Sequence, residues 1–272
     1  MIQLAAINRQ LESAGSGDRI ALTAVIDTAL CVGAGGSSGS LADKPILKTA
    51  NNQLVIPASQ LKGRLRHECE KLTRALGWPT CESPIAQTMC PQRAGLTEQD
   101  FYIESYRVDD PPDGDAEEDE RKRKYRYHCL ICQLFGNPSL PSKLQFSDLV
   151  CTTEPDSIPE VLRPGVTINR RRRTAEEKKL YFLETSPANA ALAFKGAITL
   201  ASNTPIFAKA LILAGLKHIH ALGGSKSAGL GWLHWESKVF ENTEIEDSAW
   251  TFLGSANTST VQTKKDTTTG GA

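Results

Sequence analysis

LVIPASQLKGRLRHECEKLTRALG, residues 54–77, changes from strand-like to helical periodicity and thereby sets the architecture around it. One face of the helix would carry apolar residues at spacings of four, four and three: Leu61, Leu65, Cys69 and Leu72. Ser59, which follows Pro57, is the predicted N-cap of this helix. Gly77 and Pro79 predict where the helix ends. We therefore expect a short strand that leads directly into an amphipathic helix.

The other segments of the sequence predict an α+β fold. Strand-like runs occupy residues 19–30, 144–150, 194–200 and 232–236, and an apolar helix occupies residues 205–222. The order strand, helix, insertion, strands, helix, strand is compatible with a ferredoxin-like (RRM-like) core, and such sheets commonly serve RNA recognition. We expect a single domain over residues 1–240 with an insertion at 78–141. The Thr-, Ser- and Gly-rich tail, residues 241–272, is predicted to be disordered.

Charge is distributed unevenly, although 31 basic and 31 acidic residues give a net charge of zero. Residues 109–120 hold eight carboxylates, the next six residues hold five bases, and four arginines stand at 170–173. The average therefore hides basic patches, and the region around 107–124 is expected to be partly disordered. The chain shows neither the pattern of a signal peptide nor an apolar run of 18 residues, so we expect a cytoplasmic protein.

Seven cysteines in such a chain favour metal binding over disulfides, because cytosolic thiols stay reduced. Four of them lie in the insertion and could close one structural Zn²⁺ site: Cys81, Cys90, Cys129 and Cys132. His128 and the pair His67 and Cys69 are rival ligands. A redox pair or cysteines packed as small hydrophobic residues would be the alternatives. Cys31 and Cys151 lie in or near strands and are interpreted as core residues.

Two segments have the composition of an anion-binding backbone. The first is the start of the helix, which combines basic, small and hydroxyl residues: Ser59, Lys62, Gly63, Arg64 and Arg66. The second is GGSKSAGLG at 223–231, where small residues surround one lysine: Gly223, Gly224, Ser225, Lys226 and Ser227. A solvated helix and a flexible connection would explain the same patterns.

Residues 163–187 predict a protruding hairpin, since two β-like stretches flank a charged tip. The tip carries consecutive arginines, among them Arg170, Arg171 and Arg172. These side chains could grip phosphates, stack on bases or lie in solvent.

Four segments in this order resemble the RAMP superfamily, and within it the Cas-seven-type backbone proteins of type III CRISPR complexes. They are GAGGSSGSLADKPILKTANNQLVIPASQLKGRLR (33–66), CLICQLFG (129–136), GVTINRRRRTAEEKKLYFLET (165–185) and ALGGSKSAGLGWL (221–233). The resemblance covers roughly residues 20 to 236. The chain departs from it at Ala58, where the family often has glycine, and in the acidic tract at 109–120.

The resemblance implies a guide-RNA-binding backbone subunit built on an RRM-like RAMP domain. It implies that the helix start and the glycine loop hold the guide backbone and that the hairpin is a thumb wedged into the guide–target duplex. It also implies that Asp43, in the Asp-x-Pro motif, cuts target RNA with Mg²⁺ or Mn²⁺. The subunit would act only within the assembled complex, in a head-to-tail filament with other effector subunits.

Three other functions fit the same sequence. The first is a structural backbone subunit of the same family that does not cut. The second is a guide-processing endoribonuclease of the superfamily, which would need a catalytic His or Tyr in a cleft; His67 is the only histidine near a family motif. The third is a zinc-stabilised protein-interaction module.

Overall fold

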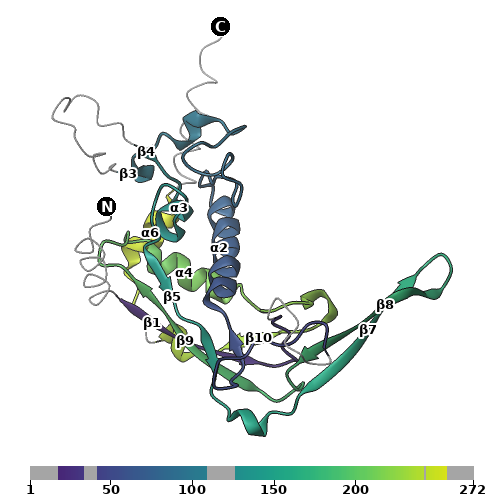
Figure 1. The fold of residues 1–272 in the computed structure, drawn as a ribbon. Coiled ribbons are helices and arrows are strands. Elements are labelled where there is room, and N and C mark those ends of the chain that lie inside the picture. The colour runs from purple at the N-terminus through teal and green to yellow at the C-terminus, as the bar shows by residue number, and fades with distance from the viewer. Residues whose placement is uncertain (1–17, 34–41, 109–125, 242, 256–272) are drawn as a thin grey trace, which may run out of the picture.

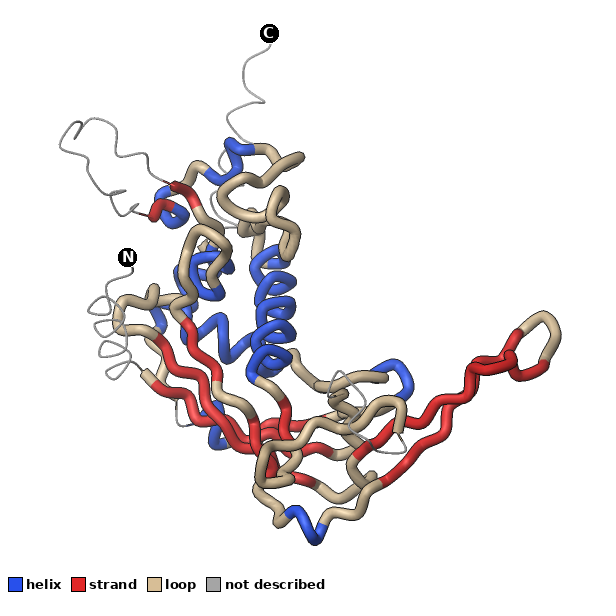
Figure 2. Tube along the Cα trace, viewed as in Figure 1, coloured by secondary structure: helices blue, strands red, loops and turns tan. Residues whose placement is uncertain are grey.

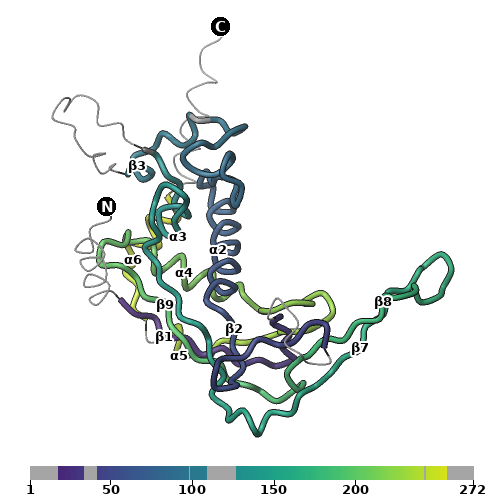
Figure 3. Tube along the Cα trace, in the orientation of Figure 1, coloured from purple at the N-terminus to yellow at the C-terminus, as the bar shows by residue number. Residues whose placement is uncertain are grey.

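The computed structural model describes residues 18–33, 42–108, 126–241 and 243–255, and the acidic tract and the chain ends lie outside these ranges. The main sheet is antiparallel and has the order β10-β1-β9-β6-β2, with β5 also paired to β9. Its strands are β1 (Arg19–Ile26), β2 (Val55–Ile56), β5 (Leu144–Phe146), β6 (Leu149–Cys151), β9 (Leu192–Leu200) and β10 (Leu233–Trp235). Figure 3 shows β1, from the start of the chain, beside β9 from its last third.

Alternation along β1 explains which face of the sheet carries the helices. Its even-numbered residues, Ile20, Leu22, Ala24 and Ile26, are buried, and its odd-numbered residues are not. They share one core with α2 (Ala58–Ala75) and α4 (Ala208–Lys217), which Figure 1 shows on the same side of the sheet. The predicted α+β class is confirmed, although α4 is shorter than the predicted helix.

The face predicted for α2 is confirmed, but its predicted cap is wrong. Leu61, Leu65 and Cys69 are fully buried. The N-cap is Pro57, and Ser59 lies exposed inside the first turn without capping the helix. The Asp148 side chain caps the helix instead, because its Oδ1 accepts a hydrogen bond of 2.7 Å from the Ala58 N–H. A carboxylate at a helix N-terminus also complements the helix dipole.

Asp148 reaches the helix because the predicted strand at 144–150 is really two strands. β5 and β6 both pair with β9, and residues 147–148 between them leave the ladder. Ser147 Oγ accepts a hydrogen bond of 2.8 Å from the Ala197 N–H and so anchors the break.

The insertion contains the 3₁₀ turns η2 (Glu98–Phe101) and η3 (Glu104–Tyr106), the pair β3 (Arg107–Val108) and β4 (Arg126–Tyr127), and the short helix α3 (Leu130–Phe135). Its core is aromatic. Tyr106 is fully buried beside Trp78, and its hydroxyl donates a hydrogen bond of 2.5 Å to the Pro79 carbonyl.

The prediction of disorder from residue 241 is wrong for the first part of the tail. After α5 (Lys238–Glu241), residues 247–254 form α6 (Asp247–Gly254). Phe252 stacks on Trp78, and the Trp78 indole N–H donates a hydrogen bond of 2.9 Å to the Leu253 carbonyl. Trp78 thus joins the insertion to the tail, a long-range contact that local composition does not encode. Residues 256–272 lie outside the described residues.

The hairpin is formed by β7 (Val161–Asn169) and β8 (Thr174–Thr185), and it projects away from the main sheet (Figure 2). At its tip, Asn169 Oδ1 accepts hydrogen bonds from the Arg171 and Arg172 N–H groups. None of the helices in the described ranges is both long and apolar enough to cross a membrane.

Gly215 of α4 tests the interface between α2 and α4, and Gly63 of α2 is the control outside it. A Cβ at Gly215 would lie 2.7 Å from Cys69 Sγ, whereas one at Gly63 would meet nothing within 4 Å. Gly215→Ala should therefore lower the free energy of unfolding by about 1–3 kcal/mol through overpacking. Gly63→Ala should raise it by about 0.5–1 kcal/mol through backbone entropy. Urea unfolding of both variants checks this, and equal effects would contradict the packing.

Candidate functional site

Asp43 lies at the base of the hairpin, and its side chain is exposed. Its Oδ2 accepts a hydrogen bond of 2.7 Å from the Phe182 N–H of β8. The next residue, Lys44, continues this pairing: its N–H donates to the Phe182 carbonyl, and its carbonyl accepts from the Glu184 N–H. The Asp43 segment therefore pairs with β8 through an isolated parallel bridge between Lys44 and Leu183, and the carboxylate has a defined position.

The buried Glu184 side chain binds the backbone that follows Asp43. It is only 5% exposed, and its carboxylate accepts a hydrogen bond of 3.2 Å from the Ile46 N–H. Lys48 Nζ lies 3.1 Å from Glu184 and 2.7 Å from the exposed Glu160. Burial opposes the charge of Lys48, but hydrogen bonds to Glu160 and Glu184 outweigh burial and raise its pKa. Sequence reasoning missed both groups, because Glu184 and Lys48 are far apart in the chain.

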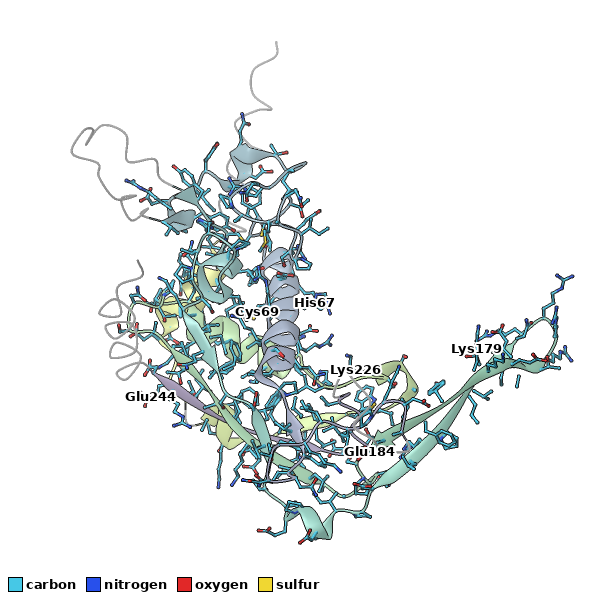
Figure 4. The ribbon with its side chains drawn as sticks, in the orientation of Figure 1. His67, Cys69, Lys179, Glu184, Lys226 and Glu244 are labelled. Atoms are coloured by element: carbon cyan, nitrogen blue, oxygen red, sulfur yellow. The ribbon has the colours of Figure 1, made fainter. Side chains whose placement is uncertain are left out.

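A short segment after β1 joins the hairpin base to the glycine loop. The Leu30 N–H donates to Ser186 Oγ, and the Leu30 carbonyl accepts from the Ser186 N–H. Cys31 O accepts a hydrogen bond of 2.6 Å from the Gly224 N–H. The predicted glycine loop and the base of the hairpin are thus held by one stretch of backbone, residues 30–31. Figure 4 shows Glu184 and Lys226 in this part of the molecule.

The glycine loop contains residues in left-handed conformations. Gly223 has φ +96°, and a Cβ there would lie 2.7 Å from the Cys31 carbonyl, so this position requires glycine. Ser225 also adopts a left-handed conformation. Gly224, Ser225, Lys226 and Ser227 are exposed, and the Lys226 ammonium donates to the Gly223 carbonyl. The loop is therefore presented to solvent on a rigid base.

The residues predicted at the start of α2 differ in exposure and in their partners. Ser59 and Gly63 are exposed and Lys62 is half-buried; burial, followed by repulsion from Arg66, lowers the pKa of Lys62. Arg64 pairs with Glu68 at 2.8 Å. Arg66 is bound within the protein, with Nε 3.0 Å from Glu70 and Nη1 donating to the Gly136 carbonyl. Lys62 and Arg66 therefore have different surroundings despite their helical spacing.

The predicted arginines of the hairpin, Arg170, Arg171 and Arg172, are exposed at the tip. Asp43 is bonded to Phe182, near the opposite end of β8. The hairpin also exposes large apolar residues along its length: Leu162, Val166, Ile168, Leu180 and Tyr181.

The four cysteines of the insertion come together as predicted. Cys81, Cys90, Cys129 and Cys132 are all buried, and their sulfur atoms lie within 4.8 Å of one another. Two pairs are at 3.5 Å (Cys81–Cys132) and 3.6 Å (Cys129–Cys81). Hydrogen bonds from Cys129 lower the pKa of both Cys90 and Cys132. The pKa of Cys129 itself is raised by hydrogen bonds from the other three cysteines and by burial, and that of Cys81 is raised as well.

This geometry fits a tetrahedral metal centre. Zn–S bonds of about 2.3 Å place the sulfurs of a tetrahedron about 3.8 Å apart, close to the separations found here. The rival ligands are elsewhere: His128 is buried against Asn137, His67 is exposed, and Cys69 packs on α4, where burial raises its pKa. The four cysteines could therefore hold a metal ion such as Zn²⁺.

Comparison with known proteins gives the family. A profile of the RAMP superfamily matches residues 23–234, more than three quarters of the chain. The chain belongs to the RAMP superfamily. No curated protein matches the sequence.

Among solved structures, one similar chain comes from a cryo-EM structure described as the Type III-B Cmr-beta bound to cognate target RNA. The TM-score is 0.50 at 14% sequence identity, with 87% of this chain and 66% of that chain covered. The RAMP chain thus spans just under two thirds of that chain's length, and at this identity the likeness concerns the fold.

The metal centre predicts which cysteines hold zinc. Cys81→Ser should remove most of the zinc from purified protein, because a four-sulfur site loses one of its ligands. Cys151→Ser, a buried cysteine of β6 outside the cluster, should keep about one zinc ion per chain. Mass spectrometry of the metal content checks both. Zinc retained in full by Cys81→Ser would contradict the assigned ligand set.

Proposed function

We propose that this chain is a guide-RNA-binding backbone subunit of a type III CRISPR effector complex and that Asp43 cleaves the paired target RNA. Superfamily membership supports the first part, as does the fold likeness to a chain in a complex described as bound to target RNA. The exposed Asp43 carboxylate, held by β8 at the base of the hairpin, carries the second part. Partner subunits would stack head-to-tail along the guide.

The core is proposed to be ferredoxin-like. The chain order β1, α2, β5/β6, β9, α4, β10 follows the pattern β-α-β-β-α-β. In the sheet, the last strand lies beside the first, and β9 lies between the first strand and the β5/β6 pair. Sheets of this type commonly bind RNA.

The guide backbone is proposed to follow the surface formed by the glycine loop and the start of α2. The loop offers backbone N–H groups and Lys226, and the helix start offers Lys62, Ser59 and Gly63. Such contacts bind phosphates without reading base sequence, which suits a subunit that must accept any guide. Arg66 is better explained as a structural residue, since its guanidinium is occupied within the protein.

The hairpin is proposed to act as a thumb against the duplex. Its exposed apolar residues could pack against unstacked bases, and the arginines at its tip could bind phosphates. The same strand, β8, holds Asp43. Engagement of RNA by the thumb and placement of the carboxylate would therefore involve one element.

At the scissile linkage, the 2′-oxygen would bond to phosphorus while the bond to the 5′-oxygen breaks. The 5′-oxygen would keep the electron pair and take a proton from water, which leaves a 2′,3′-cyclic phosphate on the other fragment. Asp43 could accept the 2′-hydroxyl proton or bind a divalent ion. Mg²⁺ or Mn²⁺ bound there would stabilise the phosphate charge. In the described ranges, the cysteine cluster is the only group of three or more potential metal ligands. An ion at Asp43 would thus be completed by RNA and water, as is common for Mg²⁺.

Asp43→Asn tests the cleavage. In a reconstituted complex, it should slow target cleavage by about 10²-fold or more while leaving guide and target binding unchanged. Asp27→Asn, an exposed aspartate paired with His234, is the matched control and should cleave normally. Cleavage assays and RNA-binding titrations measure the two effects. Undiminished cleavage by Asp43→Asn would remove Asp43 from the cleavage site and favour a non-cleaving structural subunit.

Glu184→Gln tests the positioning of Asp43. The amide loses the charge that holds Lys48 and weakens the anchor of the Asp43 segment, so cleavage should fall roughly ten- to a hundredfold. Glu160→Gln removes the other, exposed partner of Lys48 and should have little effect. Single-turnover rates at saturating target separate this loss from binding. Equal rates for both variants would show that Glu184 does not position the carboxylate.

A further inference from the structure

Arg93 is a buried cation whose surroundings need an explanation. It is only 4% exposed, and it lies in the insertion with its guanidinium 4.8 Å from the centre of the Phe101 ring. Nη1 donates a hydrogen bond of 2.7 Å to the Tyr127 carbonyl, and Nε has no hydrogen-bond partner in the described part of the chain. Among the residues that the structure describes, no carboxylate forms an ion pair with Arg93. A buried charge without a counter-charge is strongly destabilising.

The nearest candidate for that counter-charge is sulfur. Arg93 Nη1 also lies 3.7 Å from Cys90 Sγ, within hydrogen-bonding distance for a sulfur acceptor. The Cys129 N–H donates to the same sulfur at 3.4 Å. A neutral thiol accepting these bonds would leave the charge of Arg93 uncompensated, whereas a thiolate would compensate it.

A second arginine approaches the cluster from another element. Arg66 belongs to α2, and its Nη2 lies 3.6 Å from Cys132 Sγ. The rest of its guanidinium is fixed by Glu70 and by the Gly136 carbonyl, and Ser83 in turn donates to Glu70. Two guanidinium groups therefore donate to two different cysteines of one cluster.

We propose that Arg93 and Arg66 are outer-sphere partners of a metal-bound four-thiolate centre. Four thiolates around Zn²⁺ carry a net charge of −2, and the two guanidinium groups place positive charge beside the sulfurs of Cys90 and Cys132. The charge of Arg66 is shared with Glu70, whereas Arg93 faces the sulfur without a carboxylate partner among the described residues. The metal centre thereby supplies the anion that buried Arg93 lacks, and the arginines stabilise charge that would otherwise be buried alone. Outer-sphere partners of this kind commonly change metal affinity 10- to 100-fold. This inference does not depend on the proposed RNA function.

The arrangement also couples the insertion to α2. Arg66 lies on α2, in the main domain. Its hydrogen bond to Cys132 therefore connects the metal centre to the helix that packs on the sheet. Arg93 acts within the insertion itself. Loss of Arg66 should weaken the attachment of the insertion to α2, and loss of Arg93 should weaken the retention of the metal.

The test is zinc release from the purified, zinc-loaded full chain to a chromogenic chelator. Arg93→Met should release zinc about 10- to 100-fold faster than the unaltered chain, and Arg66→Met should also release it faster. Arg93→Lys, which keeps the charge but not the planar donor geometry, should fall between. Lys71→Met is the control, because Lys71 pairs with Glu68 on the same helix and touches no cysteine. Release rates for Arg93→Met and Arg66→Met equal to that of Lys71→Met would overturn the proposal.

Cobalt substitution gives a readout if Arg93→Met does not fold. Co²⁺ bound by four thiolates has a sulfur-to-metal charge-transfer band whose energy depends on hydrogen bonds to sulfur. Arg66→Met should shift this band to lower energy relative to the unaltered chain, while Lys71→Met should not. An unshifted band, or the absence of any four-thiolate cobalt spectrum in the unaltered chain, would also overturn the proposal.

Discussion

The antiparallel pairing of β1 with β9 is the constraint on which the rest of the structure depends. All eight residues of β1 pair with β9, from Arg19 opposite Thr199 to Ile26 opposite Leu192. This register brings the segment after β1 against the segment before β9. Leu30 can then form two hydrogen bonds with Ser186, and the Cys31 carbonyl can accept a hydrogen bond from the Gly224 N–H of the glycine loop. A slip of one residue would turn the buried face of β1 outward and separate these contacts.

Periodicity and motif order were enough to predict the α+β class, the buried face of α2, the hairpin and the cysteine cluster. These features depend on local pattern or on residues whose chemistry is specific, such as Cys81 and Cys132. The predicted cap at Ser59 failed because the helix start is satisfied by Asp148, a residue 90 positions away. The tail was misjudged because the partner of α6 is Trp78, in the insertion.

The proposed RNA surface shows the same limit. Sequence reasoning placed Lys62, Arg64 and Arg66 together in one phosphate-binding helix start and treated the three as equivalent. In the structure, acidic residues one turn further along α2 pair with both arginines. Helical spacing predicts which residues share a face, but it does not predict which of them are already occupied by neighbours.

The attachment of Asp43 near the foot of the hairpin has a mechanical consequence. Phe182 is eight residues from Thr174 at the distal end of β8, a distance of about 26 Å along an extended strand, but only three residues from the end of β8 at Thr185. A two-stranded ribbon that pivots at its root swings widely at its free end and little beside the pivot. Different nucleotides could therefore deflect the distal arginines considerably while the carboxylate keeps its place.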